Sequence, residues 1–302
     1  MKKNLKIFVF LVVLLSPSFV YLQEWDPLQE WHLDVPYVPT KPEVIAKMLE
    51  MAHVGKDDVL YDLGCGDGRI VVTAAKLYGT RGVGVDINPE RIKESRENAA
   101  REGVTHLVKF LEQDLFQTDI HEATVLTLYL LSSVNLRLRP VIFAELRPGT
   151  RVVSHDFSMD TWKADQHEVV TVDGQEHSVY FWVVPANASG SWKWTLTEGQ
   201  RNSSYELDLS QHFQVLDGRF RLDGREYALK DLTINGEKIA FSVDRGDGGK
   251  VRTIVFEGRV RRNTIEGMMV VRGQGTNQRN PWKAERNPAT MKPIDVDEES
   301  RY

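Results

Sequence analysis

The sequence predicts an α/β domain built on a doubly wound, mostly parallel seven-stranded sheet, followed by a small antiparallel all-β domain. The first observation is that short apolar runs alternate with segments of helical periodicity between residues 42 and 156. The second is a glycine-rich turn that joins one apolar run to a helix near residue 64. The third is that helical periodicity ends near residue 190, after which short alternating segments are separated by Asp-Gly and Asn-Gly turns.

The composition is that of an ordinary globular protein. The chain has 302 residues, of which 41% are hydrophobic and 27% are charged, so both domains have enough apolar side chains for a core. The formal net charge of −5 argues against a general nucleic-acid binder, which would carry a basic surplus, and no nucleic-acid partner is expected. The sole cysteine, Cys65, excludes an intrachain disulfide.

The first 22 residues have the pattern of a targeting segment. Lysines precede an apolar run at residues 7–15, and small residues follow at 16–18. This order predicts a secretory signal, with an uncleaved membrane anchor and a buried helix as the alternatives, and the run is short for a span of roughly 20 residues. The positive-inside rule places the rest of the chain outside the cytoplasm. We therefore expect an exported or membrane-anchored protein, which a reporter fusion after Thr40 would test.

Residues 23–40 form a linker rich in proline and aromatic residues. It ends in Pro-Tyr-Val-Pro-Thr, where Thr40 is a good N-cap for a helix predicted over residues 41–53 by apolar residues at helical spacing. Tyr37 and Thr40 either close over a bound cofactor and line an acceptor site, or only tether the linker and cap the helix.

The first strand and the glycine turn are the most informative stretch of the chain. Residues 59–63 are an apolar run that contains one acid, Asp62, and three glycines at alternate positions from Gly64 then allow a tight turn before a helix over residues 70–77. A dinucleotide-binding loop would need glycine where this chain has Arg69. The pattern indicates a loop for another nucleotide cofactor, and the alternative is a glycine-rich turn without a ligand.

Acidic side chains end the next two strands. Asp86 closes the strand over residues 82–87, about 20 residues after the glycine loop, where an acid accepts hydrogen bonds from ribose hydroxyls. Asp114 closes the strand over residues 108–116 and is the candidate partner for an adenine amino group. The alternatives are a helix cap for Asp86 and a surface turn for Asp114.

Two more strands and a hairpin complete the predicted sheet. Residues 123–131 and 150–156 are apolar strands on either side of a helix over residues 132–146. Residues 168–172 and 178–184 flank an Asp-Gly turn and predict an antiparallel hairpin.

The pattern Asp62-x-Gly64-x-Gly66-x-Gly68 resembles motif I of the class I S-adenosylmethionine (SAM) dependent methyltransferases. The Pro-Tyr-Val-Pro-Thr segment resembles the mitochondrial protein-lysine methyltransferases that modify carriers and ATP synthase subunits, and residues 134–154 look like the seven-strand histone-lysine branch. The resemblance spans about residues 36–185 and implies SAM as the cofactor. The cofactor-binding residues that it implies are Thr40, Asp62, Gly64, Cys65, Gly66, Asp86, Ile87, Asp114, Leu115, Tyr129 and Leu130.

The end of the fourth strand departs from this pattern. It reads Leu-Tyr-Leu-Leu-Ser at residues 128–132, where families that methylate nucleic-acid amines carry Asn/Asp-Pro-Pro-aromatic and the histone branch carries an Asn-rich motif. No cysteine lies there, which excludes methylation of a base carbon through a thiol adduct. The candidate catalytic residues are Tyr37, Tyr129, His155 and Asp156. Because adjacent strand residues point to opposite faces, at most one of His155 and Asp156 is expected to face the substrate. No metal site is expected.

The leading interpretation is a SAM-dependent methyltransferase whose acceptor is a protein lysine amine. A small-molecule methyltransferase is the runner-up. A third interpretation is a protein of this fold that binds a ligand without catalysis, because SAM is made in the cytosol and an exported enzyme would be separated from it. For the same reason, the alternative that the domain faces the cytoplasm is kept.

Residues 41–187 are expected to form the methyltransferase domain, and residues 190–286 a small antiparallel barrel or sandwich. The second domain serves either as a recognition module or as a stabilising or dimerising appendage, and the sequence does not give the oligomeric state. Residues 287–302 are polar and are expected to be a disordered tail.

Overall fold

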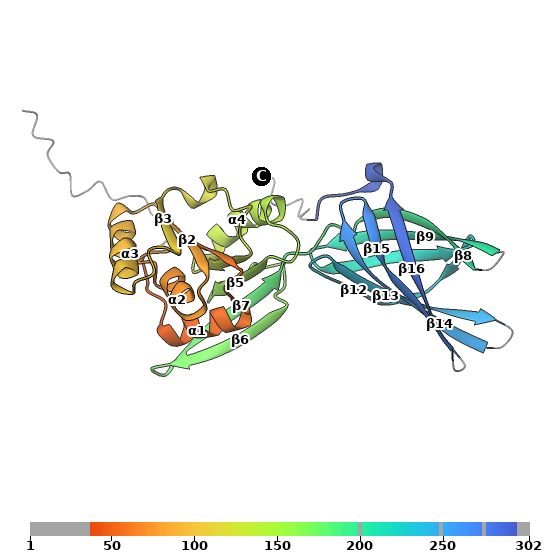
Figure 1. The fold of residues 1–302 in the computed structure, drawn as a ribbon, viewed down its shortest axis with the longest axis horizontal. Helices are drawn as coiled ribbons and strands as arrows, with labels where there is room; N and C mark the ends of the chain where they lie inside the picture. The colour runs from red at the N-terminus through yellow and green to blue at the C-terminus, as the bar shows by residue number, and fades with distance from the viewer. Residues whose placement is uncertain (1–36, 199–200, 248–249, 274–275, 295–302) are drawn as a thin grey trace, which may run out of the picture. The chain divides into compact units, whose positions relative to one another are not determined.

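The computed structural model describes residues 37–198, 201–247, 250–273 and 276–294 (Figure 1). The predicted signal or anchor at residues 1–22, and the linker up to residue 36, lie outside the described residues. Within those ranges, no helix is both long and apolar enough to cross a membrane.

The first sheet has seven strands in the order β3-β2-β1-β4-β5-β7-β6. β1 to β5 pair in parallel, β7 is antiparallel to β5, and β6 is antiparallel to β7, as the sequence predicts. The elements are α1 (Pro42–Met51), β1 (Val59–Leu63), α2 (Arg69–Tyr78), β2 (Arg81–Asp86), α3 (Pro89–Arg101), β3 (Val108–Glu112), β4 (Val125–Leu128), α4 (Ser132–Glu145), β5 (Arg151–His155), β6 (Gln166–Val172) and β7 (Gln175–Val183). The strand order reverses between β1 and β4, and open α/β sheets bind ligands at such a point.

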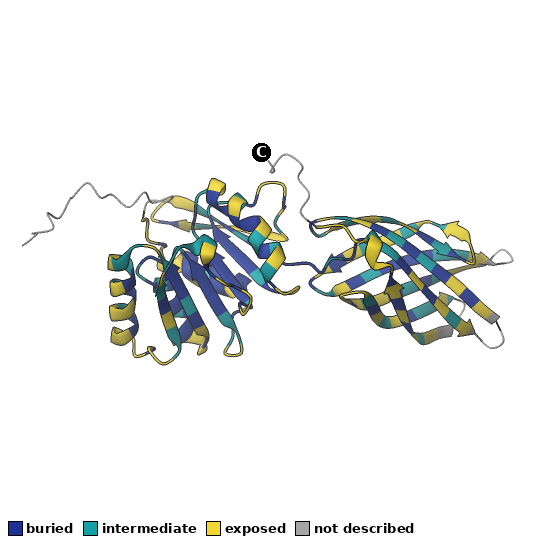
Figure 2. Ribbon diagram, turned by 90° about the horizontal axis from the view of Figure 1, so that it is seen from above, coloured by how far each residue is buried: buried dark blue, intermediate teal, exposed yellow. Residues whose placement is uncertain are grey.

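Helices cover both faces of this sheet. Side chains of α1, α2 and α3, including Met48, Val71 and Ile92, share one buried apolar cluster with residues of β1, β5 and β7. On the other face, Leu138 of α4 belongs to a second cluster that contains Trp182 of β7. The central strands are correspondingly buried (Figure 2). This packing fixes the carboxyl ends of β1, β2 and β4 at one edge of the sheet.

The start of α1 differs from the prediction in one respect. The N-cap is Lys41 rather than Thr40, and no side chain accepts a capping hydrogen bond there, because Pro42 already supplies a helix-compatible first residue without an N–H to satisfy. The Thr40 hydroxyl instead lies 3.3 Å from Nδ1 of His155. Thr40 therefore connects the linker to the end of β5.

The second sheet is antiparallel, as predicted, and has nine strands in the order β11-β10-β9-β8-β16-β15-β14-β13-β12. The strands are β8 (Gly190–Glu198), β9 (Arg201–His212), β10 (Val215–Leu222), β11 (Arg225–Tyr227), β12 (Leu229–Asn235), β13 (Lys238–Asp247), β14 (Lys250–Arg261), β15 (Thr264–Gly273) and β16 (Thr276–Arg286). β12 and β16 are rich in polar residues and show no clear apolar run in the sequence.

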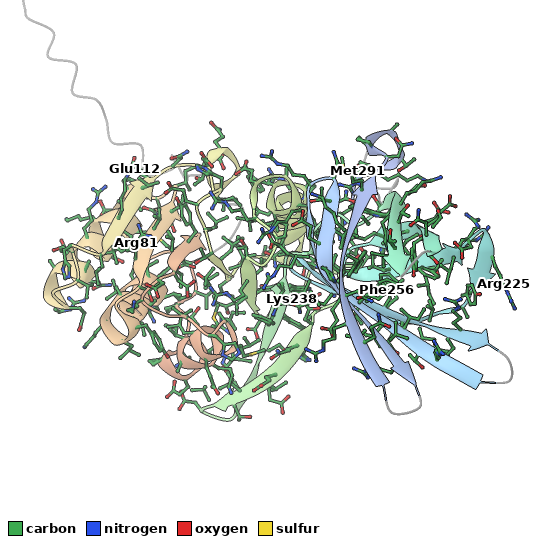
Figure 3. The ribbon with its side chains drawn as sticks, turned by 45° about the vertical axis from the view of Figure 1, so that its right-hand side comes forward. Arg81, Glu112, Arg225, Lys238, Phe256 and Met291 are labelled. Atoms are coloured by element: carbon green, nitrogen blue, oxygen red, sulfur yellow. The ribbon has the colours of Figure 1, made fainter. Side chains whose placement is uncertain are left out.

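An aromatic core fills the second sheet. Phe256, labelled in Figure 3, is fully buried and its ring packs on those of Phe241 and Trp282 at 4.7 and 5.2 Å between centroids. Trp194 and Tyr205 stack beside them at 5.2 Å. Such pairs add to the free energy gained by burying apolar area, so this sheet has a core of its own.

The segment after β16 is ordered further than predicted. A short 3₁₀ helix spans Pro288–Thr290, the Thr290 hydroxyl accepts a hydrogen bond from the Ser191 amide, and the Lys292 carbonyl accepts one from Asn187. The expectation of a disordered tail is therefore wrong for residues 287–294, because their backbone groups are paired with β8 and its approach. Residues 295–302 lie outside the described residues.

Candidate active site

The glycine loop connects β1 to α2 at the point where the strand order reverses. Gly64, Gly66 and Gly68 have φ angles of 76°, 53° and 73°, which is the left-handed region that favours glycine. The Gly64 and Cys65 amides donate to the Val85 carbonyl at 2.8 and 2.9 Å. The loop is thus tied to the end of β2, and its backbone conformation explains why glycines recur at alternate positions.

Asp86 holds the other side of this loop. Its carboxylate accepts hydrogen bonds from the Gly66 amide at 2.8 Å and from the Asn88 amide at 2.9 Å. The helix-cap alternative does not describe Asp86, because the N-cap of α3 is Asn88, whose side chain accepts from the Glu90 amide. Ile87, the next predicted cofactor contact, is exposed beside it.

Two side chains pack directly on the glycines. A Cβ atom on Gly64 would lie 2.7 Å from Cδ2 of Leu130, and one on Gly66 would lie 2.4 Å from Cε2 of Tyr37. The Arg91 guanidinium lies over the Tyr37 ring, 4.4 Å from its centroid. The structure therefore brings the linker, the loop and the end of β4 together, as the functional interpretation of Tyr37 requires.

Asp62 lies inside the sheet below the loop. Its side chain is 2% exposed and accepts a hydrogen bond from the Thr127 hydroxyl at 2.7 Å. Burial raises the pKa of Asp62 to about 7, and the bond from Thr127 opposes this effect only in part. Asp62 is therefore close to half-ionised at neutral pH, which is unusual for a structural acid.

Replacing Asp62 by asparagine should stabilise the fold at high pH. The folded chain keeps the Asp62 proton between pH 4 and 7 whereas the unfolded chain releases it, so ionisation lowers folding stability as pH rises through this window. Asparagine does not ionise and still offers an oxygen to Thr127. At pH 8 the variant is expected to gain roughly 2–4 kcal/mol, and near pH 4 almost nothing. Urea unfolding at both pH values measures this, and an equal difference at both would contradict the assignment.

Two further predicted cofactor contacts, Asp114 and Cys65, make contacts within the protein. Asp114 accepts hydrogen bonds from the Phe116 amide and the Gln117 side chain, capping a 3₁₀ helix that spans Leu115–Gln117. These contacts are those of a residue in a surface turn, and the hydrogen bond from adenine to Asp114 stays a prediction. Cys65 is buried, and burial raises the pKa of its thiol well above the usual value, so it is a packing residue.

His155, Asp156 and His177 form a cluster at the end of β5. Nε2 of His155 lies 3.1 Å from Nδ1 of His177 and 3.2 Å from Oδ2 of Asp156, and the last two atoms are 3.4 Å apart. The expectation that at most one of His155 and Asp156 faces this side is wrong. β5 ends at His155, and the φ of 60° at Asp156 turns its carboxylate back toward the histidine.

Tyr129 belongs to the same cluster. Its ring stacks on His155 with 3.8 Å between centroids. Burial, with a smaller contribution from Asp156, raises the pKa of the Tyr129 phenol, so it stays protonated at neutral pH. Burial lowers the pKa of His155 to about 4, so this imidazole is neutral. Three of the four candidate catalytic residues are therefore in contact, and Thr40 joins them through His155.

His177 is a member of this cluster that the sequence pattern did not reveal. It lies on β7, the antiparallel partner of β5, where Val179 is opposite His155. His177 lies two residues before Val179, the residue that pairs with His155. This spacing would have indicated the contact, but only once the pairing of β5 with β7 was known.

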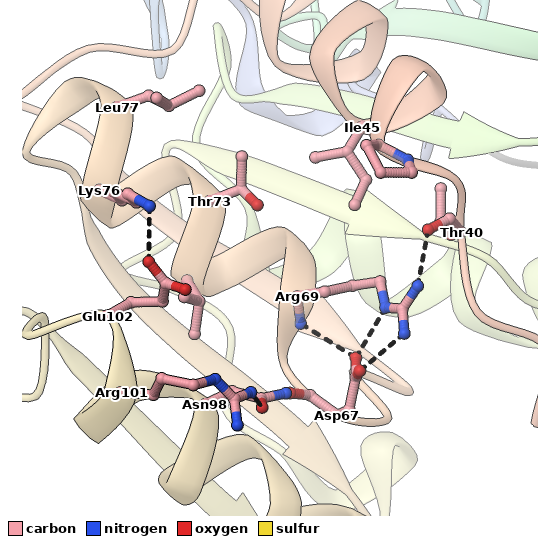
Figure 4. Close-up of a pocket in the computed structure, with 12 residues that line it drawn as sticks. Thr40, Ile45, Asp67, Arg69, Thr73, Lys76, Leu77, Asn98, Arg101 and Glu102 are labelled. Atoms are coloured by element: carbon pink, nitrogen blue, oxygen red, sulfur yellow. Dashed lines mark hydrogen bonds and ion pairs between the residues drawn. The ribbon is translucent and has the colours of Figure 1, made fainter.

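A pocket of about 390 Å³ opens between α1, α2 and α3 (Figure 4). Arg69 lies at its wall, where it pairs with Asp67 and donates to the Thr40 carbonyl. Lys76 and Glu102 form an ion pair on the opposite side. The charges in the pocket thus largely neutralise one another, and Asp67 and Thr40 connect it to the glycine loop.

Comparison with known proteins gives a consistent result. A family model described as the ANTKMT methyltransferase domain matches residues 62–166. A protein-lysine N-methyltransferase from Saccharolobus islandicus is 48% identical over 151 residues, which are 50% of this chain and 94% of that protein. An adenine nucleotide translocase lysine N-methyltransferase from Mus musculus is 31% identical over 160 residues, which are 53% of this chain and 66% of that protein.

Solved structures include the crystal structure of an RNA methyltransferase from Salinibacter ruber in complex with S-adenosyl-L-homocysteine. It is 54% identical to this chain and has a TM-score of 0.46, with 48% of this chain and 93% of that chain covered.

Proposed function

We propose that this chain, which belongs to the protein-lysine branch of the class I SAM-dependent methyltransferases, transfers a methyl group to the side-chain amine of a protein lysine. The observation that carries the choice of acceptor is the 48% identity to a protein-lysine N-methyltransferase, 94% of which is covered. The donor is SAM, which supplies a methyl group on a positively charged sulfur when bound.

The residues at the carboxyl ends of β1 and β2 fit the adenosine part of this donor. The Asp86 carboxylate has oxygen lone pairs left after its bonds to Gly66 and Asn88, and these can accept hydrogen bonds from ribose hydroxyls. Gly64 and Gly66 have no side chain, so Leu130 and Tyr37 pack directly on the loop and stand beside the proposed donor site. We assign Leu130 and Leu115 to the apolar contacts with the base.

Tyr37 and Tyr129 are our candidates for the acceptor side. Methyl transfer needs the acceptor nitrogen in line with the carbon–sulfur bond, and this alignment carries most of the rate enhancement. The nitrogen forms a bond to the methyl carbon as the carbon–sulfur bond breaks, and the nitrogen then loses a proton. The Tyr129 phenol, protonated and held against His155, can accept a hydrogen bond from the amine and orient its lone pair.

Lysine must reach this site as a neutral amine. With an ordinary pKa of about 10.4, deprotonation at pH 7 costs roughly 4–5 kcal/mol. Burial, which raises the pKa of the Tyr129 phenol, also disfavours the ammonium and lowers the cost of deprotonation. The Asp156 carboxylate in the same cluster acts in the opposite direction, so burial must outweigh it.

The acceptor class is tested by following tritium from labelled SAM into a cell lysate. The proposal predicts label in protein that survives treatment with ribonuclease and appears as methyllysine after acid hydrolysis. Lysate proteins whose lysines have been acetylated should take up little label. Label confined to RNA or to small molecules would contradict the lysine assignment while leaving the methyltransferase assignment in place.

A further inference from the structure

We propose that His155, Asp156 and His177 bind a divalent transition-metal ion of the zinc class. The three facing atoms, two imidazole nitrogens and one carboxylate oxygen, are separated by 3.1, 3.2 and 3.4 Å. A tetrahedral ion with bonds of about 2.0–2.1 Å holds its ligand atoms about 3.3 Å apart. One ion therefore fits among these atoms with almost no movement, and the three residues have the ligand types and the proximity that a metal site requires.

The backbone builds this arrangement from two neighbouring strands. His155 is the last residue of β5, and His177 lies on β7, which pairs with β5 antiparallel. Asp156 follows the strand with a φ of 60°, a conformation that aspartate adopts more readily than most non-glycine residues. This turn brings the carboxylate toward both imidazoles.

Two of the three ligands, Asp156 and His155, are also held from behind. The second oxygen of Asp156 accepts a hydrogen bond from the Ser178 amide at 2.8 Å, which directs the first oxygen to the histidines. The second nitrogen of His155 lies 3.3 Å from the Thr40 hydroxyl, and Tyr129 stacks on its ring. Metal-binding histidines and carboxylates are characteristically oriented by such outer contacts.

The charge of the cluster favours a bound ion over hydrogen bonds alone. Two imidazole nitrogens and a carboxylate oxygen converge there, and no ion pair between Asp156 and a lysine or arginine is found within the part of the chain that the structure describes. A divalent cation supplies the missing positive charge.

The donor set selects the class of ion. Two imidazoles with one carboxylate suit Zn²⁺, Co²⁺ or Ni²⁺, whereas Mg²⁺ and Ca²⁺ prefer oxygen ligands. Three protein ligands leave at least one coordination position for water or a bound molecule. The cluster touches Tyr129, so an ion there would lie beside the candidate acceptor site. The inference does not depend on the identity of the methyl acceptor.

The test uses untagged full-length protein that has been treated with EDTA and dialysed. Titration with Zn²⁺ in a calorimeter should give one site per chain, and Co²⁺ should give the visible absorption of a low-coordinate site. His177→Ala should weaken Zn²⁺ binding at least 100-fold and abolish the Co²⁺ bands. Asp156→Asn, which preserves the shape of the side chain, should weaken binding at least 10-fold.

The matched control is His167→Ala. His167 lies on β6 of the same hairpin, hydrogen-bonds the Ser178 hydroxyl and is outside the cluster, so this variant should bind Zn²⁺ like the wild type. Circular dichroism checks that every variant is folded. Failure of the wild type to bind Zn²⁺, or equal binding by the wild type and Asp156→Asn, would overturn the proposal.

Discussion

Replacing Asp86 by alanine is expected to lower the affinity for SAM by about 30- to 1000-fold. The carboxylate anchors the Gly66 amide and the turn at Asn88, and we assign its free lone pairs to the ribose hydroxyls. Hydrogen bonds to a charged group contribute about 1.5–3 kcal/mol each, and removing one partner leaves the others unpaired. A loss of about 2–4 kcal/mol corresponds to the stated range.

Calorimetric titration with SAM and with S-adenosylhomocysteine measures this effect. Asp86→Asn should be intermediate, because its amide keeps one acceptor oxygen while its nitrogen cannot accept from the Gly66 amide. Asp57→Ala removes an exposed acid ahead of β1 and is the matched control for the change in charge. An Asp86→Ala protein that binds SAM as tightly as the control would refute the ribose assignment.

Replacing Gly66 by alanine is also expected to lower the affinity for SAM strongly. The added Cβ would lie 2.4 Å from the Tyr37 ring, and the φ of 53° costs a non-glycine residue about 1–2 kcal/mol. Relief of the crowding requires the Tyr37 ring or the loop to move, and relief of the backbone strain requires the loop to change shape, which weakens the bond from the Gly66 amide to Asp86. We expect the affinity for SAM to fall at least 30-fold, measured in the same titration.

Gly103→Ala separates backbone strain from crowding. Gly103 has a φ of 71°, and a Cβ there meets nothing within 4 Å, so it carries similar strain away from the loop. This variant should be slightly less stable and should bind SAM normally. The double variant Tyr37→Ala and Gly66→Ala removes the crowding alone and should recover part of the lost stability. Full binding by Gly66→Ala would show that the loop is not a cofactor site.

The sheet and its glycine loop were predictable because their signals are local. Apolar strands and periodic helices alternate along most of residues 42–156, and that order is typical of a parallel sheet covered by helices. The left-handed φ angles of Gly64, Gly66 and Gly68 leave few other residue types for those positions. Asp86 was placed by its spacing from the loop, and the structure brings the two within a hydrogen bond.

The acceptor side was less predictable because its signals are not local. The contact of His177 with His155 depends on the register of β7 against β5, which the hydrophobic pattern does not reveal. The reversal at Asp156 depends on one φ angle after the strand. Threonine suits both a helix cap and a contact with His155, so the sequence favoured the cap at Thr40. Only the tertiary fold places its hydroxyl beside His155.

We infer that the glycine loop and Asp86 hold the methyl donor at the point where the strand order reverses. A crystal structure of the protein with S-adenosylhomocysteine would test this directly. We expect the ribose hydroxyls within hydrogen-bonding distance of the Asp86 carboxylate, and the sulfur directed toward Tyr129. Ligand bound away from the ends of β1 and β2, for example in the pocket between α1, α2 and α3, would contradict it.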